Sequence, residues 1–434
     1  MKLKAIGIMA ICCAALGAGY YLYTHGAFVP KATVEDSALG VAELRQLVTE
    51  DNQRSRTIMF AAASKEDYAL EYRERGAHST RTLPAQDASF KDGKSSYVLY
   101  KAKLTGLEPA TDYEYRIVNG KNQGSWHVLA TDNGRQVKAM IFSDSQSGDG
   151  YATWRKLAHS AWEHSKAAQL YLNLGDQVDN GASKEHWQGW FSGIVPFAAE
   201  LPAATVVGNH ETYDLKWKPR LPKAYHHLFA LPEALASYKN QFYSFDYGPI
   251  HFTVLDTNYT TGLQLLQPGL GEEQLAWLEN DLMVAKAPWK VVLMHRDVLM
   301  YKFSKASGRS SKRETKFNSV AKDLMPIFDK YGVDVVLSGH LHAYRRRVRL
   351  KNFVPHAQGT TYILTGPCGD QIHYAKLWED FVWDAQRSPE RPDIGNYMTL
   401  DAEPNFLTLQ AFLPDGREFD KITLKKNQTD GKIW

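Results

Sequence analysis

Five short polar clusters along the sequence carry the side chains that could do chemistry. They comprise Asp144, Asp176, Asn209 with His210, His295, and His340 with His342. Their donors are oxygen and nitrogen and include no thiolate, which suits Mg, Mn, Fe or Zn in mixed coordination rather than a structural zinc. A lone histidine at a strand end is more often a hydrogen-bonded structural residue. Five clusters in order, each after an apolar run, make coincidence improbable and predict a metal centre.

The elements that must position these side chains are strands buried on both faces. Each cluster follows or ends a run rich in apolar and β-branched residues, at 139–142, 170–174, 205–207, 291–294 and 333–337. Near-continuous apolar runs are typical of parallel strands covered by helices. The residue spacing predicts such helices at 151–166 and 272–285. In a layered α/β domain of this kind, ligands gather at the carboxyl ends of the strands, where the clusters lie.

An all-β region precedes this domain. Residues 97–104 and 113–118 alternate between two faces, and turn signals such as Asp92-Gly93 separate the runs. We expect a small β-sandwich. The stretch from Leu107 to Tyr113 resembles the end of a fibronectin type III domain, in which L-x-P-x-T-x-Y leads into a strand and the tyrosine makes a corner hydrogen bond. The region offers no convergent acid, base or metal ligand, so its predicted role is packing.

Length and composition limit the possible classes of protein. The chain has 434 residues, enough for two or three domains, and 44% of them are apolar and 23% charged, as in ordinary globular proteins. Three cysteines exclude a disulfide scaffold, and a net charge of +3 does not demand a nucleic-acid partner. A mean hydropathy of −0.41 excludes a polytopic membrane protein.

The N-terminus differs from the rest of the chain. Lys2 and Lys4 precede an uncharged run at 5–23, intermediate in length between a secretory core and a spanning helix. Because no clean A-x-A cleavage site follows, the pattern favours an uncleaved anchor with the body exported to the periplasm or the extracellular space. We therefore expect a signal or anchor segment at 1–30 and a short amphipathic connector at 31–55.

The motif series resembles the calcineurin-like metallophosphoesterase superfamily. It reads Asp144-Ser-Gln146, Gly175-Asp176-Gln-Val-Asp179, Gly208-Asn209-His210-Glu211, Val292-Leu-Met-His295 and Gly339-His340-Leu-His342. The text between the motifs, such as Gly339-His-Leu-His-Ala-Tyr344-x-Arg346, is similar to the purple acid phosphatase branch. The resemblance implies a fibronectin type III-like domain at 56–133, followed by a layered αββα sandwich at 134–425.

The resemblance also implies roles for individual residues. One metal would be held by Asp144, Asp176 and His342, and the other by Asn209, His295 and His340, with Asp176 bridging both. The two ions would be Fe, Zn or Mn. A hydroxide shared between them would attack phosphorus, while His210 stabilises or protonates the leaving oxygen.

Two positions depart from the purple branch. Asp179 stands where that branch has the tyrosine that gives the colour, so we expect a protein that is not purple, in which Asp179 orients His210. Gln146 stands where the wider superfamily often has a histidine ligand, and it could bind weakly or hold a water. We expect Glu211, Tyr344 and Arg346 to support the ligands.

These observations favour an exported dinuclear phosphoesterase that hydrolyses phosphomonoesters. Its partner would be a small phosphoester; no nucleic-acid-binding module is evident, and the N-terminal segment could associate with a membrane. Two alternatives stay open. The same core could serve a phosphodiesterase or nucleotide hydrolase, or the chain could be a non-catalytic adhesion or binding protein with a decayed hydrolase domain.

Overall fold

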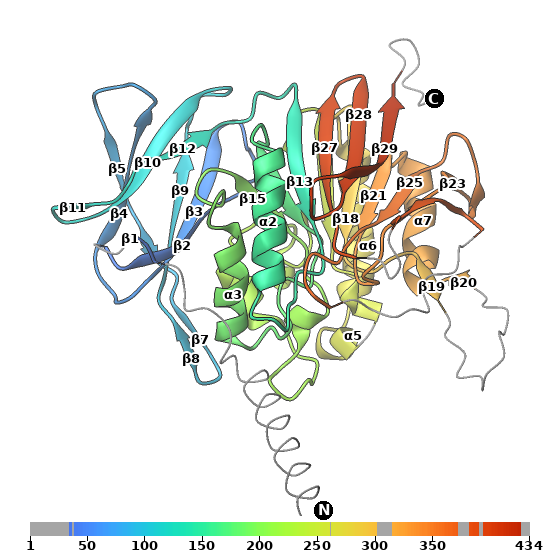
Figure 1. Ribbon diagram of the computed structural model, residues 1–434, viewed down its shortest axis with the longest axis horizontal. Coiled ribbons are helices and arrows are strands. Elements are labelled where there is room, and N and C mark those ends of the chain that lie inside the picture. The colour runs from blue at the N-terminus through green and yellow to red at the C-terminus, as the bar shows by residue number, and fades with distance from the viewer. Residues whose placement is uncertain are drawn as a thin grey trace, which may run out of the picture.

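The computed structural model describes residues 34–36, 39–260, 262–301, 315–371, 382–389 and 394–426 (Figure 1). The predicted signal or anchor segment at 1–30 lies outside the described residues. Within the described ranges, no helix combines the length and the apolar character needed to cross a membrane.

The first of two large sheets runs through the whole molecule. In spatial order its strands are β29 (Glu418–Lys425), β28 (Phe406–Phe412), β27 (Tyr397–Glu403), β13 (Val137–Phe142), β14 (Leu170–Asn173), β15 (Pro202–Thr205), β2 (Val41–Leu47), β3 (Ser55–Ala62), β9 (Leu99–Thr105) and β6 (Gln86–Asp87), with β1 (Val34–Asp36) beside β2. Strands β13, β14 and β15 are parallel, so their carboxyl ends share one edge.

The second sheet faces part of the first. Its order is β16 (Tyr243–Tyr247), β17 (Ile250–Leu255), β18 (Trp289–Met294), β21 (Val335–Ser338), β25 (Thr361–Leu364), β22 (Arg345–Arg347) and β26 (Asp384–Arg387). Strands β17, β18, β21 and β25 are parallel. Apolar side chains of both sheets meet in one buried cluster, and the predicted αββα sandwich is confirmed.

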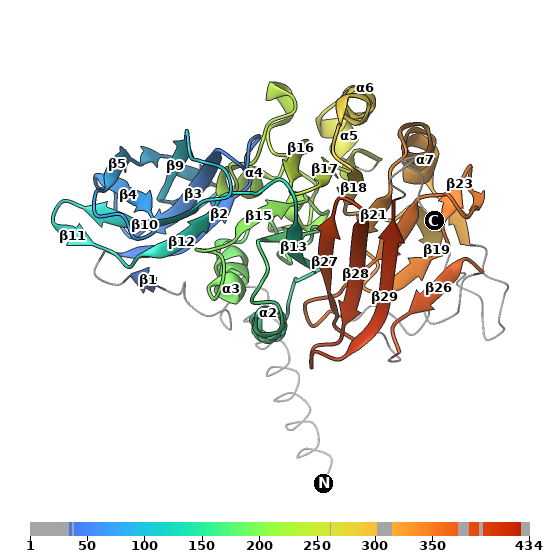
Figure 2. The ribbon, with the colours of Figure 1, turned by 90° about the horizontal axis from the view of Figure 1, so that it is seen from above.

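Helices lie on the outer face of each sheet, as the view from above in Figure 2 shows, while within the described part of the chain no helix lies over β27, β28 and β29. The longer helices of the described residues are α2 (Ala152–His164), α3 (Lys184–Ile194), α6 (Leu270–Val284) and α7 (Ser319–Tyr331). Helices α2 and α3 lie against the first sheet, and α6 and α7 against the second. The shorter helices are α4 (Lys223–Leu228) and α5 (Gly262–Leu266).

Local sequence explains where α7 begins and ends. The Asn318 side chain accepts the N–H of Ala321 at 3.0 Å and caps the first turn. Gly332 ends the helix with a φ of 67°, a conformation that glycine adopts without steric cost. Between them, Val320, Leu324 and Phe328 recur every four residues and bury one face against the second sheet.

The N-terminal sandwich packs the β2–β3–β9 end of the first sheet against a smaller sheet. The smaller sheet contains β11 (Asn122–Gln123), β12 (His127–Ala130), β10 (Asp112–Asn119), β4 (Tyr68–Glu74) and β5 (Arg81–Pro84). A separate apolar cluster fills the space between them. Tyr113 accepts the N–H of Glu108 at 3.0 Å, which is the corner hydrogen bond expected for this tyrosine.

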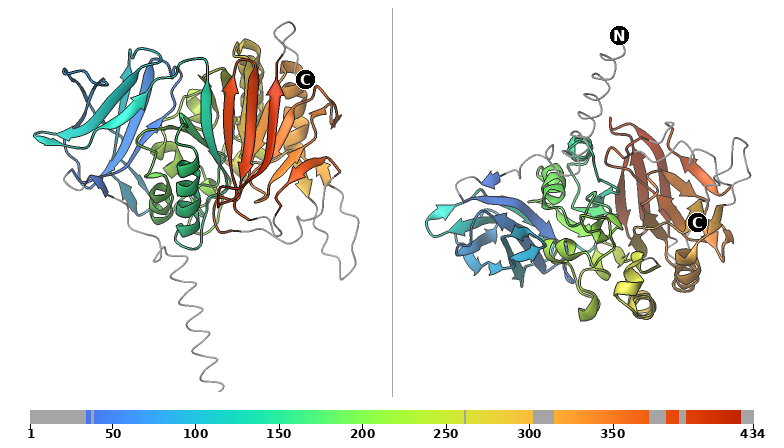
Figure 3. Two further views of the ribbon diagram at one scale, coloured as in Figure 1. Left: turned by 45° about the horizontal axis from the view of Figure 1, so that its top comes forward. Right: turned by 90° about the horizontal axis from the view of Figure 1, so that it is seen from below.

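Three two-stranded ribbons complete the described structure. They are β7 (Phe90–Asp92) with β8 (Ser95–Tyr97), β19 (Leu299–Tyr301) with β20 (Thr315–Phe317), and β23 (Leu350–Lys351) with β24 (Val354–Pro355). Both views of Figure 3 place the N-terminal sandwich at the end of the molecule opposite α7.

The predicted connector at 31–55 is wrong over much of its length, because it contains β2. This strand pairs antiparallel with β3 and parallel with β15, where Gln46 lies opposite Pro202. Its apolar pattern is broken by polar residues that are nevertheless buried. Arg45 donates to the carbonyl of Leu228 at 2.6 and 3.1 Å, and Gln46 donates to Ala199 at 2.8 Å. These contacts span the junction between the sandwich and the α/β domain.

The buried His251 on β17 sits between two carboxylates. Its Nδ1 lies 2.7 Å from Asp246 and its Nε2 3.0 Å from Asp281. Burial alone would lower the pKa of His251, but the hydrogen bonds and charges of both carboxylates outweigh it and raise the pKa to about 9. His251 is therefore a satisfied core histidine that carries a charge at neutral pH.

This cluster makes the stability of the fold depend on pH. The folded pKa of His251 lies above the unfolded value, so its contribution is full below about pH 6.5 and is lost as pH rises through about 9. We expect the free energy of unfolding to fall over this window by on the order of 3 kcal/mol.

Urea unfolding of His251→Gln at pH 6.5 and 9.5 checks this expectation, because the variant should lose most of that pH dependence. Exposed His164→Gln is the matched control. An unchanged pH dependence in His251→Gln would contradict the assignment.

Candidate metal centre

The predicted ligands lie at the carboxyl ends of the parallel strands of both sheets. Asp144 follows β13, Asp176 follows β14 and Asn209 follows β15 in the first sheet, while His295 follows β18 and His340 and His342 follow β21 in the second. Since the parallel strands of both sheets end at the same edge of the sandwich, the fold brings all six side chains together.

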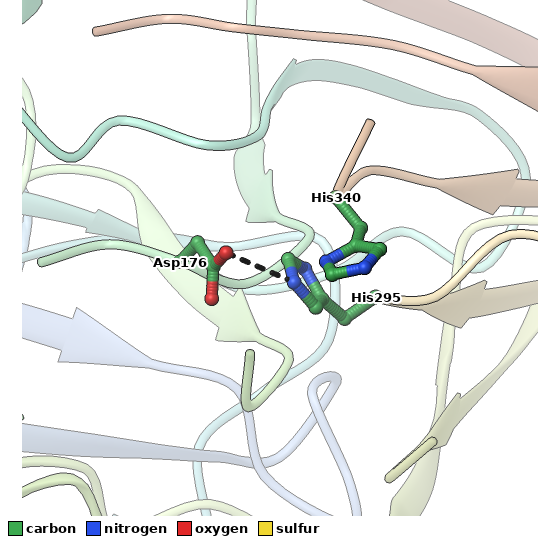
Figure 4. A group of neighbouring side chains, drawn as sticks. All are labelled: Asp176, His295 and His340. Carbon is green, nitrogen blue, oxygen red and sulfur yellow. Dashed lines mark ion pairs between the residues drawn. The ribbon is translucent and has the colours of Figure 1, made fainter. Parts of the chain in front are cut away.

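Two groups of potential ligands share one carboxylate. Asp176, His295 and His340 form one, and Asp144, Asp176 and His342 form the other, with the ligand atoms of each group within 4.8 Å of one another. Figure 4 shows the three side chains of the first group converging from separate segments. Asn209 adds its Oδ1, 3.1 Å from Nε2 of His295. The two groups share Asp176, and the assignment of their members as ligands of two ions stays a prediction.

The backbone is strained at four of these positions. The φ angles of Asp144, Asp176, His340 and His342 are 53°, 51°, 77° and 48°, in the left-handed region that side chains other than glycine rarely adopt. Each such residue costs on the order of 1 kcal/mol, and such strain clusters at functional sites. Four strained residues so close together lower the stability of the fold, which indicates that they are kept for a functional reason.

Glu211 holds the loop that carries Asp176. Its Oε2 accepts the N–H groups of Asp176 at 2.9 Å and Gly208 at 2.7 Å, and its Oε1 accepts that of Val178 at 3.2 Å. A Cβ at Gly208 would lie 2.1 Å from Asp176 Oδ1, so only glycine permits this approach. Glu211 thus fixes the backbone on both sides of Asp176.

Main-chain carbonyls orient two of the histidines. His295 Nδ1–H donates to Leu174 O at 2.9 Å, and His342 Nδ1–H donates to Gln371 O. In each ring this bond turns Nε2 toward the carboxylates, which leaves that nitrogen to bind a cation. His340 differs, because its Nε2 lies 3.1 Å from Nη1 of Arg296.

Burial and mutual repulsion perturb the acids of the site. Burial raises the pKa of Asp144 to about 7, and burial together with the charge of Asp176 raises the pKa of Glu211 to about 7. The pKa of Asp176 is instead lowered, because nearby His295 and His210 outweigh its burial. Burial would lower the pKa of His295, but the charge of Asp176 raises it to about 9. Cations bound here would compensate this concentration of carboxylates.

Gln146 tests whether the site fits a cation. Its Nε2 lies 3.1 Å from His342 Nε2, while its Oε1 is buried and has no hydrogen-bond partner in the described part of the chain. An unpaired buried carbonyl oxygen costs about 1–3 kcal/mol. A cation held by Asp144 and His342 would lie within reach of this side chain and remove that cost. The residues present therefore fit metal binding.

His210 lies beside the two groups with one ring nitrogen fixed. Its Nδ1–H donates to the backbone carbonyl of Asp179 at 2.7 Å, while the Asp179 carboxylate lies 3.8 Å away and accepts from Gln371 at 2.8 Å. Asp179 therefore orients His210 mainly through its main chain, a refinement that a side-chain motif does not reveal. His210 Nε2 faces the centre, 3.9 Å from Asp176 Oδ2.

Tyr344 and Arg346 were expected to support His342, and the structure places their polar groups elsewhere. Tyr344 donates to Asp420 of β29 at 2.7 Å, and Arg346 donates to both oxygens of the same carboxylate at 2.7 and 2.9 Å. The two residues tie the second sheet to the first through Asp420. The prediction failed because Asp420 lies far away in the sequence.

Sequence reasoning missed an aromatic loop next to His210. The rings of Tyr213 and Trp217 lie edge-on to its imidazole at 5.7 and 5.9 Å between centroids. The Trp217 side chain is 51% exposed. Its backbone has a φ of 61°, in the left-handed region that residues other than glycine rarely adopt. Asp214 stabilises this loop by accepting the N–H groups of Lys216 and Lys218. The sequence indicates this loop only by the two aromatic residues, Tyr213 and Trp217, that follow the motif histidine His210.

Comparison with known families agrees with this architecture. Residues 137–344 match the model of the calcineurin-like phosphoesterases, and residues 43–131 match that of the purple acid phosphatase N-terminal domain. The chain therefore contains both domains, and the family resemblance of the sequence is confirmed. The second match names the N-terminal sandwich; its likeness to fibronectin type III stays a prediction.

Individual relatives cover different parts of the chain. Purple acid phosphatase 23 of Arabidopsis thaliana is 31% identical over 50% of this chain and 44% of its own, and mouse acid phosphatase type 7 is 27% identical over 70% and 72%. The chain spans about half the length of the first Arabidopsis relatives it matches. A purple acid phosphatase from yellow lupin superposes with a TM-score of 0.74 at 17% identity, covering 90% of this chain and 75% of its own. At that identity the superposition supports the fold alone.

Substitution of Glu211 tests how the site is assembled. In Glu211→Gln the amide replaces one of two oxygens that accept backbone N–H groups, so the loop bearing Asp176 should loosen. We expect metal affinity to fall about 10–100-fold, as when residues that orient metal ligands are changed.

Titration with Zn²⁺ or Mn²⁺ by calorimetry measures this change. The exposed Glu200→Gln is the matched control and should bind like the parent. Parental affinity in Glu211→Gln would show that the loop does not depend on this carboxylate.

Proposed function

Because the chain joins a calcineurin-like phosphoesterase domain to a purple acid phosphatase N-terminal domain, we propose that it is a dinuclear metal-dependent phosphoesterase acting on phosphomonoesters. The observation that carries the proposal is the pair of ligand groups sharing Asp176, with His210 beside them. The two ions would be Fe, Zn or Mn. Bound there, they would supply an activated water and neutralise the charge that develops on the phosphoryl oxygens.

The protein's own residues supply orientation and a proton. Asp144, Asp176 and His342 would hold one ion, and Asn209, His295 and His340 the other, with Asp176 touching both. His210 stands on the side from which the alcohol leaves. As the ester bond breaks, its electron pair goes to the leaving oxygen, which takes the proton from His210 Nε2, while the hydroxyl of one water ends on phosphorus. The other proton of that water is released to solvent, from which His210 is protonated again before the next turnover.

The setting of His210 suits this role. Burial would lower its pKa, but the charges of Asp176 and Asp179 outweigh burial and raise the pKa above its ordinary value. The carbonyl of Asp179 keeps a proton on Nδ1, so the proton to be transferred resides on Nε2. The Tyr213 and Trp217 rings lie edge-on to the His210 ring and would pack against an aryl or other flat leaving group.

The alternatives have weaker support. A phosphodiesterase would use the same ligands and needs room for a second ester group. A binding protein with a decayed hydrolase domain would have no reason to keep four strained ligand positions, since strain persists only where the surroundings enforce it. The absence of a tyrosine at Asp179 supports a protein that is not purple.

Export is a further part of the proposal. It is supported by Lys2 and Lys4 ahead of the uncharged run at 5–23, which together have the features of a signal or membrane anchor. A periplasmic or extracellular phosphoesterase would meet small phosphoesters outside the cytoplasm.

Hydrolysis by the purified protein tests the proposed function. We expect metal-dependent turnover of an aryl phosphate monoester that is much faster than that of the matching diester, with Mn, Zn or Fe supplied in turn. Faster cleavage of the diester would favour the phosphodiesterase. No metal-dependent turnover of either ester would overturn the proposal and leave the binding protein.

The His210→Ala variant tests the role of this imidazole. Loss of a positioned general acid should lower kcat about 10²–10⁴-fold, while metal content, measured by elemental analysis, stays at the parental value. Asp179→Asn is the matched comparison and should lose far less activity than His210→Ala, because the backbone carbonyl still orients His210 and the charge of Asp176 still favours its protonated form. Loss of metal in His210→Ala, or unchanged kcat, would refute this assignment.

A further inference from the structure

A cavity of about 230 Å³ adjoins the metal centre on the side of His340. Its wall includes Thr260, Arg296, Met300, Asn318, Ser319 and His340. His340 belongs both to this wall and to one ligand group, so a molecule with its phosphoryl group at the ligands could extend into the cavity. The chemistry of the cavity wall therefore bears on the choice of substrate.

Arg296 gives this wall a positive charge that no carboxylate of the described residues contacts directly, although the charges of Asp176 and Asp256 act on it from a distance. Its Nη1 contacts Nε2 of His340 at 3.1 Å, and its Nε is buried without a hydrogen-bond partner among the described residues. Within that same part of the chain it forms no ion pair. A guanidinium always carries its charge, and a buried donor left unpaired costs about 1–3 kcal/mol.

The carboxylates near Arg296 have other partners: Asp176 belongs to the ligand groups, and two further acids are held by hydrogen bonds. Asp297, which also lines the cavity, pairs through both oxygens with the buried Arg347. Asp256 accepts the N–H of Asn258 at 2.8 Å and the amide of Gln241 at 3.3 Å. Both acids are buried and held by these partners. The Arg296 fork is therefore available to an anion from outside the protein.

The start of α7 adds to the field on the same wall. Ser319 and Val320 occupy the first turn, where backbone N–H groups have no partner within the helix. The helix dipole places partial positive charge there. This effect is smaller than that of the guanidinium and has the same sign.

We propose that this cavity is a subsite for a second anionic group, carried by the leaving group of the substrate and bound by Arg296. The inference rests on the proposed function and deepens it, because it selects phosphoesters whose leaving group bears a phosphate or carboxylate close to the scissile phosphorus. Arg296 suits both, since its planar fork matches either anion with two parallel hydrogen bonds. The monoester hydrolysis described above is unchanged; the subsite adds binding of the departing fragment.

Three phosphonates that cannot be hydrolysed probe the subsite. Methylphosphonate occupies the metal centre alone, methylenediphosphonate adds a second phosphonate, and phosphonoacetate adds a carboxylate. We expect the metal-loaded full-length protein to bind at least one of the two doubly anionic probes about 10–100-fold more tightly than methylphosphonate, the range for charge-assisted hydrogen bonds. Which of the two binds more tightly identifies the group that the subsite takes.

Variants separate the subsite from the metal centre. Arg296→Met should reduce the preference for the second anion to about threefold or less and leave methylphosphonate affinity and metal content near the parental values. Arg296→Lys keeps the charge but lacks the fork, and it should retain only part of the preference. If Arg296→Met does not fold, Arg296→Lys tests the role of the guanidinium in its place. Arg155→Met, a similarly buried arginine that bonds Gly150 and Ser192, is the matched control.

The outcomes distinguish the inference from the function on which it rests. Equal binding of all three probes by a protein that hydrolyses phosphoesters would refute the subsite alone. A preference that persists in both Arg296 variants would also refute it. Failure of the parent to bind methylphosphonate or to hydrolyse any ester would refute the proposed function itself. Metal content measured after each titration excludes chelation by the diphosphonate as the cause of any change.

Discussion

The position of one carboxylate, that of Asp176, constrains the rest of the structure. It lies where the two sheets meet, 3.1 Å from His295 of the second sheet and 2.8 Å from the backbone N–H of His210 in the first. Glu211 grips its loop, and glycine at 208 allows the approach. Asp144, Asp176 and Glu211 are all buried close together, and such a group of acids is stable only near compensating positive charge. The fold thus concentrates negative charge at a place where bound cations would compensate it.

Contacts between distant segments keep the two sheets in register around this point. Arg346 and Tyr344 reach across to Asp420, and Arg347 holds Asp297 two residues after His295. A buried pair of this kind adds little net stability, because desolvation offsets much of its Coulomb energy. Its directional hydrogen bonds instead specify one arrangement. Largely buried charged contacts therefore add to apolar packing in fixing where the ligands of the two sheets lie.

The sequence predicted what repeats locally and missed what depends on distant partners. Apolar runs that end in polar clusters predicted a layered α/β domain with six polar residues at its strand ends, and the family resemblance added the αββα sandwich. Strand β2 was missed because Arg45 and Gln46 interrupt its apolar pattern, and they are buried by donating in part to distant carbonyls, those of Leu228 and Ala199. Asp420 could not be predicted for the same reason, because it accepts hydrogen bonds from Tyr344 and Arg346 of the other sheet, which lie far away along the chain. Arg296 and Trp217 belong to no motif, and their positions beside the site emerge only in three dimensions.

The sheet that runs from the sandwich into the α/β domain has a consequence for the chain as a whole. Strand β15 is short and fully buried, with β14 on one side and β2 on the other. Without β2 it would be an open edge, whose free N–H and C=O groups can recruit a strand from another molecule. The N-terminal sandwich therefore covers the β15 edge through β2 and so protects the α/β domain, which bears the ligands, from aggregation. A phosphoesterase half produced alone would expose this edge and be prone to self-association.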